Sequence, residues 1–220
     1  MLIGYNKPFL FVHIYKTAGT SITSCLIPYS RLIDRITYGY WPSKKIINAL
    51  NWIYNGKFNE FFTGFHKHAT AFDAKKKLPK LLFDSLFKFA FVRNPWDWEV
   101  SLYHYILQAK KHRFHKLVKK MSFSEFVQWD IDQKPLRQVD FLQDDEGNII
   151  VDFIGKYENI KDDLNYIKDK LELTINALPQ KNISKNRIYK DFRRYYNSKT
   201  IDFVDQYFKK DIEIFNYQFE

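Results

Sequence analysis

Apolar runs and polar turns alternate along the chain in a way that predicts two strand–loop–helix units. Residues 8–15 and residues 86–92 are short runs rich in aromatic and branched side chains, the pattern of buried strands. Each run ends in a short polar turn, and a segment with apolar residues at helical spacing follows directly. The first helix is expected to begin at Thr20 or Ser21, and the second is expected to have Asp97 as its N-cap.

The rest of the pattern is mainly helical. Helices are predicted over residues 43–54, 70–77, 112–120, 124–132 and 158–171, a third strand over residues 149–154, and loops over residues 61–68 and 179–185. Strands that alternate with long helical crossovers indicate an α/β fold with a parallel sheet. Ligands bind such sheets at the carboxyl ends of the strands, where both polar turns should lie. No repeat or linker-like stretch interrupts the pattern, so one domain is expected over residues 1–220.

Composition narrows the class of protein. The 220 residues are 45% hydrophobic and 19% aromatic, which is too apolar for a disordered chain. Cys25 is the only cysteine, which excludes a disulfide scaffold or a cysteine-based zinc site within one chain. The early apolar run over residues 9–12 is too short to span a bilayer, and the pattern of a signal peptide is not found. The protein is therefore expected in the cytoplasm, with a peripheral association with a membrane left open.

The formal net charge of +10 indicates an anionic partner. A nucleic acid, an acidic membrane surface, an acidic polysaccharide and a polyphosphorylated small molecule all meet this requirement. Nucleic acid is not the expected partner, because the aromatic residues follow apolar helix faces and strands, as in a core. The densest basic stretch serves either to dock an acidic glycan or merely to meet solvent. It consists of Lys110, Lys111, His112, Arg113, Lys116, Lys119 and Lys120.

The first polar turn has the features of an anion-binding loop. A helix start exposes N–H groups and carries partial positive charge, and a short loop from a strand can present both to a ligand. Small residues let the backbone approach a phosphate, while hydroxyl groups and a lysine add donors and charge. The alternative is that the hydroxyl groups cap the helix and the lysine is a solvated surface charge. The candidate residues are Lys16, Thr17, Ala18, Gly19, Thr20 and Ser21.

Arg93, at the end of the second predicted strand, indicates a second anion site. An arginine binds a phosphate through paired donors, and the hydroxyl group of Ser101, eight residues later, adds another contact. A nucleotide with two separated phosphates would bridge both loops. In the loop of nucleoside triphosphatases the lysine follows the glycines, whereas here Lys16 precedes Gly19, and no strand-end acidic residue for magnesium is evident. A nucleotide-dependent kinase on a related fold is kept as the alternative enzyme.

Two strings of the sequence carry a family resemblance: residues 13–21, His-Ile-Tyr-Lys-Thr-Ala-Gly-Thr-Ser, and residues 91–96, Phe-Val-Arg-Asn-Pro-Trp. The first is similar to the 5'-phosphosulfate loop of sulfotransferases, and the second to their 3'-phosphate motif. More narrowly, the chain resembles the carbohydrate sulfotransferases that include the glycosaminoglycan 2-O-sulfotransferases and bacterial relatives. The sequence departs from the family pattern at Trp98, where an arginine is common. Further similar strings follow in the expected order at residues 67–71, 155–160 and 211–217.

The resemblance implies a P-loop-like three-layer fold, with a central parallel sheet flanked by helices and a helix-rich C-terminal half. The implied donor is 3'-phosphoadenosine 5'-phosphosulfate (PAPS), without a metal. The implied acceptor is a carbohydrate hydroxyl, for example of an acidic polysaccharide or a lipid-linked sugar, in polysaccharide biosynthesis. Lys16 would neutralise charge on the bridging oxygen, the backbone of residues 18–21 would hold the 5'-phosphate, and Arg93 with Ser101 would hold the 3'-phosphate.

The acceptor hydroxyl needs a base, and histidine is the commonest one because its pKa lies near neutrality. His68 fits the family pattern better than His66 and is the predicted catalytic base, with His66 as the alternative. Their spacing also suits a metal, but no third ligand stands nearby in the sequence. Glu158 is expected to stabilise a helix start rather than to act as a second base. Residues 182–187 are expected in a loop that closes over the nucleotide in this family.

Overall fold

The computed structural model describes residues 1–4, 6–37, 64–175 and 187–220. The chain forms two compact units. Unit 1 comprises Met1–Val92 and Asp140–Lys181, and unit 2 comprises Arg93–Val139 and Asn182–Glu220. The helix predicted over residues 43–54 and the loop predicted over residues 179–185 lie outside the described residues.

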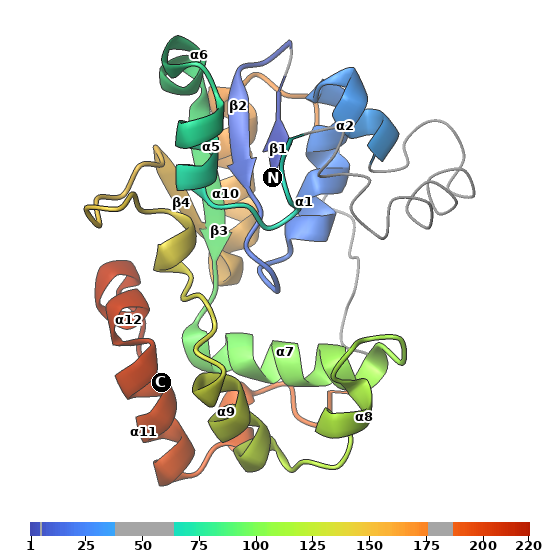
Figure 1. Ribbon diagram of the computed structural model, residues 1–220, viewed down its shortest axis with the longest axis vertical. Coiled ribbons are helices and arrows are strands. Elements are labelled where there is room, and N and C mark those ends of the chain that lie inside the picture. The colour runs from blue at the N-terminus through green and yellow to red at the C-terminus, as the bar shows by residue number, and fades with distance from the viewer. Residues whose placement is uncertain (5, 38–63, 176–186) are drawn as a thin grey trace. The chain divides into compact units, whose positions relative to one another are not determined.

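Unit 1 contains a four-stranded sheet in the order β1-β2-β3-β4 (Figure 1). Strands β2 (Phe9–Val12), β3 (Phe87–Val92) and β4 (Phe153–Lys156) run parallel, and the edge strand β1 (Leu2–Ile3) pairs antiparallel with β2. β2 and most of β3 are buried, which explains their almost continuous apolar sequences. Because β2 and β3 are parallel, their carboxyl ends lie at the same edge of the sheet, where the first polar turn begins.

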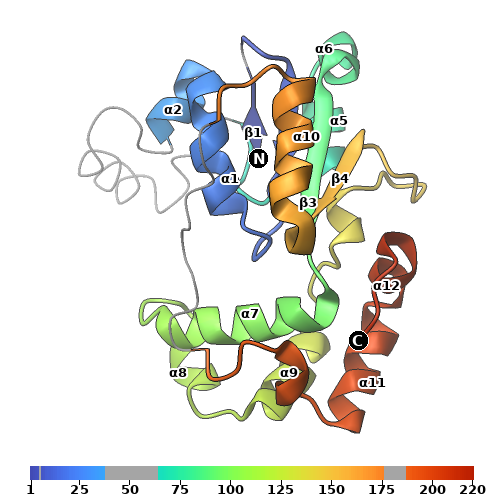
Figure 2. The same cartoon turned by 180° about the vertical axis from the view of Figure 1, so that it is seen from behind.

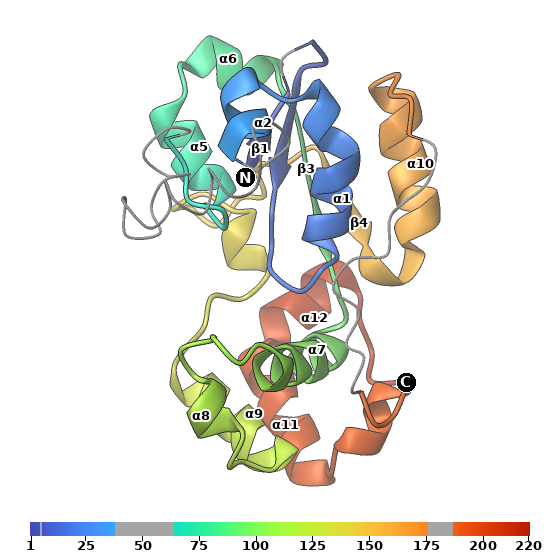
Figure 3. The same cartoon turned by 90° about the vertical axis from the view of Figure 1, so that its right-hand side faces the viewer.

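Helices cover both faces of this sheet (Figure 3). Helices α1 (Gly19–Leu26) and α10 (Ile160–Lys170) lie on one face, and α5 (Ala71–Lys77) and α6 (Lys80–Ser85) on the other. Alternate side chains of a strand point to opposite faces. One set packs against α1 and α10 and forms the main core, which includes Phe9, Phe11, Ile22, Leu26, Phe89, Phe91, Leu164 and Ile167. Smaller elements of this unit are η1 (Ile27–Tyr29), α2 (Leu32–Thr37) and η3 (Tyr157–Asn159).

Unit 2 is helical (Figure 2). Its elements are α7 (Pro95–Gln108), α8 (His115–Val118), α9 (Phe123–Asp132), η4 (Phe192–Tyr195), α11 (Ser198–Tyr207) and α12 (Lys209–Phe215). The short helix η2 (Val139–Phe141) begins at Val139, where the first segment of unit 2 ends, and continues into unit 1. Aromatic rings form much of its core. Trp98 is fully buried and meets the ring of Phe208 at 5.6 Å, edge to face. The residue that departs from the family pattern is therefore a core residue of this unit.

The start of α7 differs from the prediction. Asn94 is the N-cap, and its side-chain oxygen accepts hydrogen bonds from the N–H groups of Trp96 and Asp97. Pro95 then occupies the first helical position, where the missing N–H is harmless. Asp97 lies inside the first turn instead of capping the helix, which leaves its carboxylate available for ion pairs.

The predicted α/β fold class, with a mostly parallel sheet flanked by helices, is confirmed. The predicted helix over residues 70–77 is present, with Thr70 and Asp73 in a reciprocal capping box. Three further predictions were inaccurate. The first helix, α1, begins at Gly19 and not at Thr20 or Ser21, the third strand lies at Phe153–Lys156, and the helix over residues 112–120 shrinks to α8. The missed strand β1 has only two residues, too few to show a pattern, and it exists because β2 offers it a partner.

Candidate functional site

The loop after β2 has an unusual backbone. Lys16 and Ala18 both adopt the left-handed conformation, with φ of 65° and 61°, which non-glycine residues rarely adopt. Each such residue costs about 1 kcal/mol or more, and strain of this kind concentrates at ligand sites. Ala18 is also the N-cap of α1, and its side chain makes no capping hydrogen bond. A left-handed residue followed by a helical one points consecutive N–H groups into a concave nest that favours an anion.

The side chains of the loop divide between holding the turn and facing outward. Thr17 is fully buried, and its hydroxyl group donates a 3.0 Å hydrogen bond to the carbonyl oxygen of Ile14. Its hydroxyl hydrogen therefore closes the loop instead of reaching a ligand. Ser21 is buried in the first turn of α1, whereas Lys16 and Thr20 are partly exposed. Lys16 and Thr20 are thus the polar side chains of the loop that solvent can reach.

Gly19 has a steric reason to be glycine. A Cβ atom at this position would lie 2.0 Å from Cδ2 and 2.1 Å from Nε2 of His13. The imidazole of His13 therefore packs directly against the start of α1. His13 is 3% exposed, and burial lowers its pKa well below the usual value, with the charge of Lys67 as the next cause. His13 is thus a neutral wall of the loop, in line with the structural role that its place beside the loop indicates.

His68 lies beside this wall. Its Nδ1 is 2.8 Å from the carbonyl oxygen of His13, and its ring is 4.9 Å from the His13 ring and 6.0 Å from that of Tyr15. Because a carbonyl oxygen only accepts, Nδ1 carries the hydrogen, and Nε2 of the neutral ring keeps its lone pair. Burial, with a smaller contribution from the charge of Lys67, lowers the pKa of His68 to about 4. At neutral pH the ring is therefore in the form that can accept a proton.

His66 has a different environment. Its side chain is exposed, and its Nδ1 accepts a 3.1 Å hydrogen bond from the backbone N–H of His68. Its carbonyl oxygen accepts from the N–H of Ala69 at 3.0 Å. His66 thus stabilises the turn that presents His68, which favours His68 over His66 as the base.

Arg93 belongs to unit 2 and follows β3 directly in the chain. It is 6% exposed, and its Nε and Nη2 lie 2.7 Å and 2.6 Å from Oδ2 of Asp97. Arg187 pairs with the other oxygen of the same carboxylate at 2.8 Å. Two guanidinium groups around one carboxylate leave one net positive charge, so this cluster keeps an attraction for an anion. Ser101 is a buried residue two turns into α7.

The backbone of Arg93 is held by a residue that the sequence did not single out. The side-chain amide of Gln138 accepts from the N–H of Arg93 at 2.8 Å and donates to its carbonyl oxygen at 2.7 Å. Asp211 is fully buried and accepts from the N–H groups of Gln138 and Val139 at 2.9 Å and 2.8 Å. Asp211 begins the string 211–217 noted above, but nothing in the sequence around Gln138 indicates its role.

The structure therefore gathers the predicted residues into two groups. The loop of residues 16–21 and His68 belong to unit 1, and Arg93 and Ser101 to unit 2. Glu158, considered as a second base, lies in η3 of unit 1, just ahead of α10. Among the described residues, no group of three or more His, Cys, Asp or Glu side chains is arranged to hold a metal ion.

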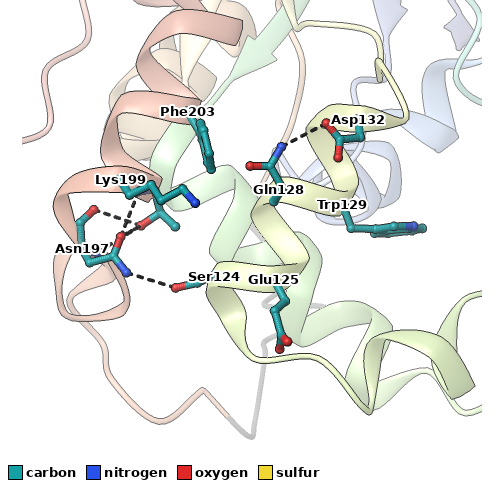
Figure 4. A pocket seen from close by; sticks show the side chains of 9 residues that line it. Ser124, Glu125, Gln128, Trp129, Asp132, Asn197, Lys199 and Phe203 are labelled. Atoms are coloured by element: carbon teal, nitrogen blue, oxygen red, sulfur yellow. Dashed lines mark hydrogen bonds between the residues drawn. The ribbon is translucent and has the colours of Figure 1, made fainter.

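A hollow of about 390 Å³ lies between α9 and α11 of unit 2 (Figure 4). Its polar side chains largely pair with one another: Gln128 donates to Asp132 at 3.0 Å, and Asn197 to Ser124 at 3.4 Å. None of the predicted site residues lines it.

In the described part of the chain no helix has the length and apolar character needed to cross a bilayer.

Comparison with known proteins agrees with these features. Residues 1–218 match the model of the family described as "Sulfotransferase family", so the chain belongs to the sulfotransferase family. An uncharacterized protein from Archaeoglobus fulgidus is 36% identical over 102 residues, which cover 45% of this chain and 78% of that protein. No solved structure matches the chain.

Proposed function

We propose that this sulfotransferase moves the sulfuryl group of PAPS to a hydroxyl group of a carbohydrate acceptor, with both units acting as one domain over residues 1–220. The observation that carries the proposal is the loop of residues 16–21, whose left-handed Lys16 and Ala18 form an anion nest at the start of α1. A family whose members transfer a charged group from a phosphosulfate needs such a nest for the 5'-phosphate.

The transfer step is assigned to groups of unit 1. The acceptor oxygen forms a bond to sulfur while the bond between sulfur and the bridging phosphate oxygen breaks. Nε2 of His68 takes the proton of the acceptor hydroxyl, and Lys16 stabilises the negative charge on the leaving phosphate. The leaving group is adenosine 3',5'-bisphosphate.

Donor specificity is assigned to unit 2. The cluster of Arg93, Asp97 and Arg187 would bind the 3'-phosphate with its one net positive charge, and the hydroxyl of Ser101 would add a donor. A carbohydrate acceptor is supported by the resemblance of residues 67–71 and 211–217 to the carbohydrate sulfotransferases. The finer choice between an acidic polysaccharide and a lipid-linked sugar depends on features outside these two groups.

Calorimetry with adenosine 3',5'-bisphosphate and with adenosine 5'-phosphate tests the proposal. The bisphosphate should bind more tightly than the monophosphate, without added magnesium, and Arg93→Lys should remove most of this difference. Arg193→Lys is the matched control, because Arg193 is an exposed arginine of the same unit that pairs with Asp191. Equal affinities for both nucleotides in the unmodified protein would contradict PAPS as the donor, and binding that requires magnesium would favour a kinase.

A further inference from the structure

Unit 2 carries a dense positive surface around α8. Six basic side chains lie within residues 110–120, and all six are exposed: Lys110, Lys111, Arg113, Lys116, Lys119 and Lys120. The sequence contains no acidic residue between Glu99 and Glu125. None of the six side chains forms an ion pair or a hydrogen bond with any residue that the structure describes. Their mutual repulsion is therefore uncompensated within the described chain.

A run of three lysines in unit 1 shows that this is not a general property of the molecule. On α5, Lys75 pairs with Asp144 at 3.1 Å and Lys77 donates to the carbonyl oxygen of Gly64 at 2.8 Å. The ammonium group of Lys76 lies 3.8 Å from the centre of the Phe72 ring. A basic run with a structural role is thus engaged locally. Of the six residues around α8, Arg113 has one such contact, with its guanidinium carbon 4.3 Å from the centre of the Phe114 ring, and the side chains of the five lysines have no ion pair, hydrogen bond or ring contact with the described residues.

Apolar side chains are exposed among these cations. Leu117 is 43% exposed and Tyr105 is 40% exposed. Val118 is fully buried and fixes the inner side of α8, so the outer side includes Lys116 and Leu117. Tyr105 belongs to the last turns of α7, directly before the basic segment, and α8 lies at that end of α7 within unit 2 (Figures 1 and 2).

We propose that the α8 basic surface, residues 110–120 together with Tyr105, docks on an anionic lipid membrane. Clusters of four to eight basic residues bind acidic headgroups, each contributing through charge. An exposed leucine and an exposed tyrosine gain from the interface between headgroups and acyl chains, where amphipathic rings concentrate. A hydrated polysaccharide or a nucleic acid would use the cations but would offer nothing to Leu117. The combination of unpaired cations and an exposed aliphatic side chain therefore favours the membrane.

The proposal is independent of the sulfotransferase chemistry, because none of these residues belongs to the loop, to His68 or to the Arg93 cluster. It would place the enzyme on a surface where lipid-linked substrates are concentrated. Vesicle binding by the full chain, without donor or acceptor, measures it directly.

The test compares vesicles of phosphatidylcholine with vesicles that also contain about 30% phosphatidylglycerol. Binding should occur only to the anionic vesicles and should weaken steeply with salt. Lys116→Ala/Lys119→Ala/Lys120→Ala should lower the partition coefficient about 100-fold. Lys75→Ala/Lys76→Ala/Lys77→Ala removes the same charge from α5 and should change it less than about two-fold. An equal loss in both triple variants would overturn the proposal, because it would show a response to net charge alone.

Leu117→Ala separates a membrane from other polyanions. It should weaken binding to anionic vesicles about five-fold, whereas Leu81→Ala, at a leucine of α6 that is 87% exposed, should have no effect. Both positions are exposed, so neither variant should change folding. No binding to anionic vesicles contradicts the proposal. An unchanged vesicle affinity in Leu117→Ala also contradicts it, and tight binding of dextran sulfate would then assign the surface to an acidic glycan.

Discussion

The two groups that we propose to bind anions are built in different ways. In unit 1 the anion would meet a strained backbone, in which Lys16 and Ala18 hold left-handed conformations at the start of α1. In unit 2 it would meet a side chain, Arg93, whose backbone and guanidinium group are held by Gln138 and Asp97. The geometry of the backbone site depends on a close contact, that of the His13 ring with Gly19. The geometry of the side-chain site depends on the residues that form hydrogen bonds with Arg93. The proposed base, His68, lies next to the first group, so substitutions in unit 1 should affect turnover and those in unit 2 mainly affinity.

Removal of the proposed base, His68, should have the largest effect. His68→Asn should lower kcat by about 100-fold to 10,000-fold, because the asparagine amide can still donate to the carbonyl oxygen of His13 but cannot accept the proton. Affinity for adenosine 3',5'-bisphosphate should stay within about two-fold of that of the unmodified protein. Turnover with PAPS and calorimetry measure the two quantities.

His66→Asn is the matched control for this substitution, since it keeps an acceptor for the N–H of His68. It should retain most of the activity. If His66→Asn loses turnover and His68→Asn does not, the base is His66.

A methyl group at Gly19 should disrupt the backbone site. Gly19→Ala places a carbon atom 2.0 Å from the His13 ring, so the loop or the ring must move, at a cost of about 1–3 kcal/mol. Affinity for adenosine 5'-phosphate should fall at least ten-fold, and thermal unfolding should begin at a lower temperature. Ala18→Gly is the contrasting variant, because glycine accepts the left-handed conformation, and it should keep both properties. Normal nucleotide affinity in Gly19→Ala would show that the loop does not hold the phosphate.

Loss of the Gln138 amide should affect the side-chain site selectively. Gln138→Leu leaves the N–H and carbonyl groups of Arg93 without their side-chain partner, which should lower the free energy of unfolding by about 1–3 kcal/mol. The preference for adenosine 3',5'-bisphosphate over adenosine 5'-phosphate should decrease several-fold. A purely structural role would lower stability and leave that preference unchanged.

Acid should affect unit 1 through its histidines. The pKa of His68 is lowered from 6.5 to about 4, so the unfolded chain binds more protons than the folded chain between these values. Stability should therefore decrease as pH falls from 6.5 towards 4, by on the order of 2 kcal/mol, and the lowered pKa of His13 acts in the same direction. Urea unfolding at several pH values should show a weaker dependence in His68→Asn. Bound donor brings negative charge, which raises the pKa of His68. The value of kcat should therefore fall in acid with an apparent pKa above the one that kcat/KM reports for the free enzyme.

Much of the fold and of the loop could be predicted because their causes are local. Apolar runs at Phe9–Val12 and Phe87–Val92, each followed by a polar turn and a helix, identify the parallel strands. The ends and lengths of helices, which depend on contacts with the rest of the fold, were predicted less accurately. Asn94 took the cap expected of Asp97, because its side chain reaches two N–H groups before Pro95 commits the chain to a helix. The helix expected over residues 112–120 is short, since only Val118 of its centre is fully buried.

The sequence by itself determined the strand–loop–helix units, the position of the polar loop over residues 16–21 and the membership of the sulfotransferase family. Each of these rests on neighbours in the chain, whose spacing fixes which face or turn they occupy. Only the tertiary structure decided that His13 packs on Gly19, that His68 donates to the carbonyl oxygen of His13, and that Gln138 holds Arg93. The last two contacts join residues 55 and 45 positions apart. Pairing at such separations follows from the packing of whole elements, because no local pattern specifies which distant side chain will fill a given position.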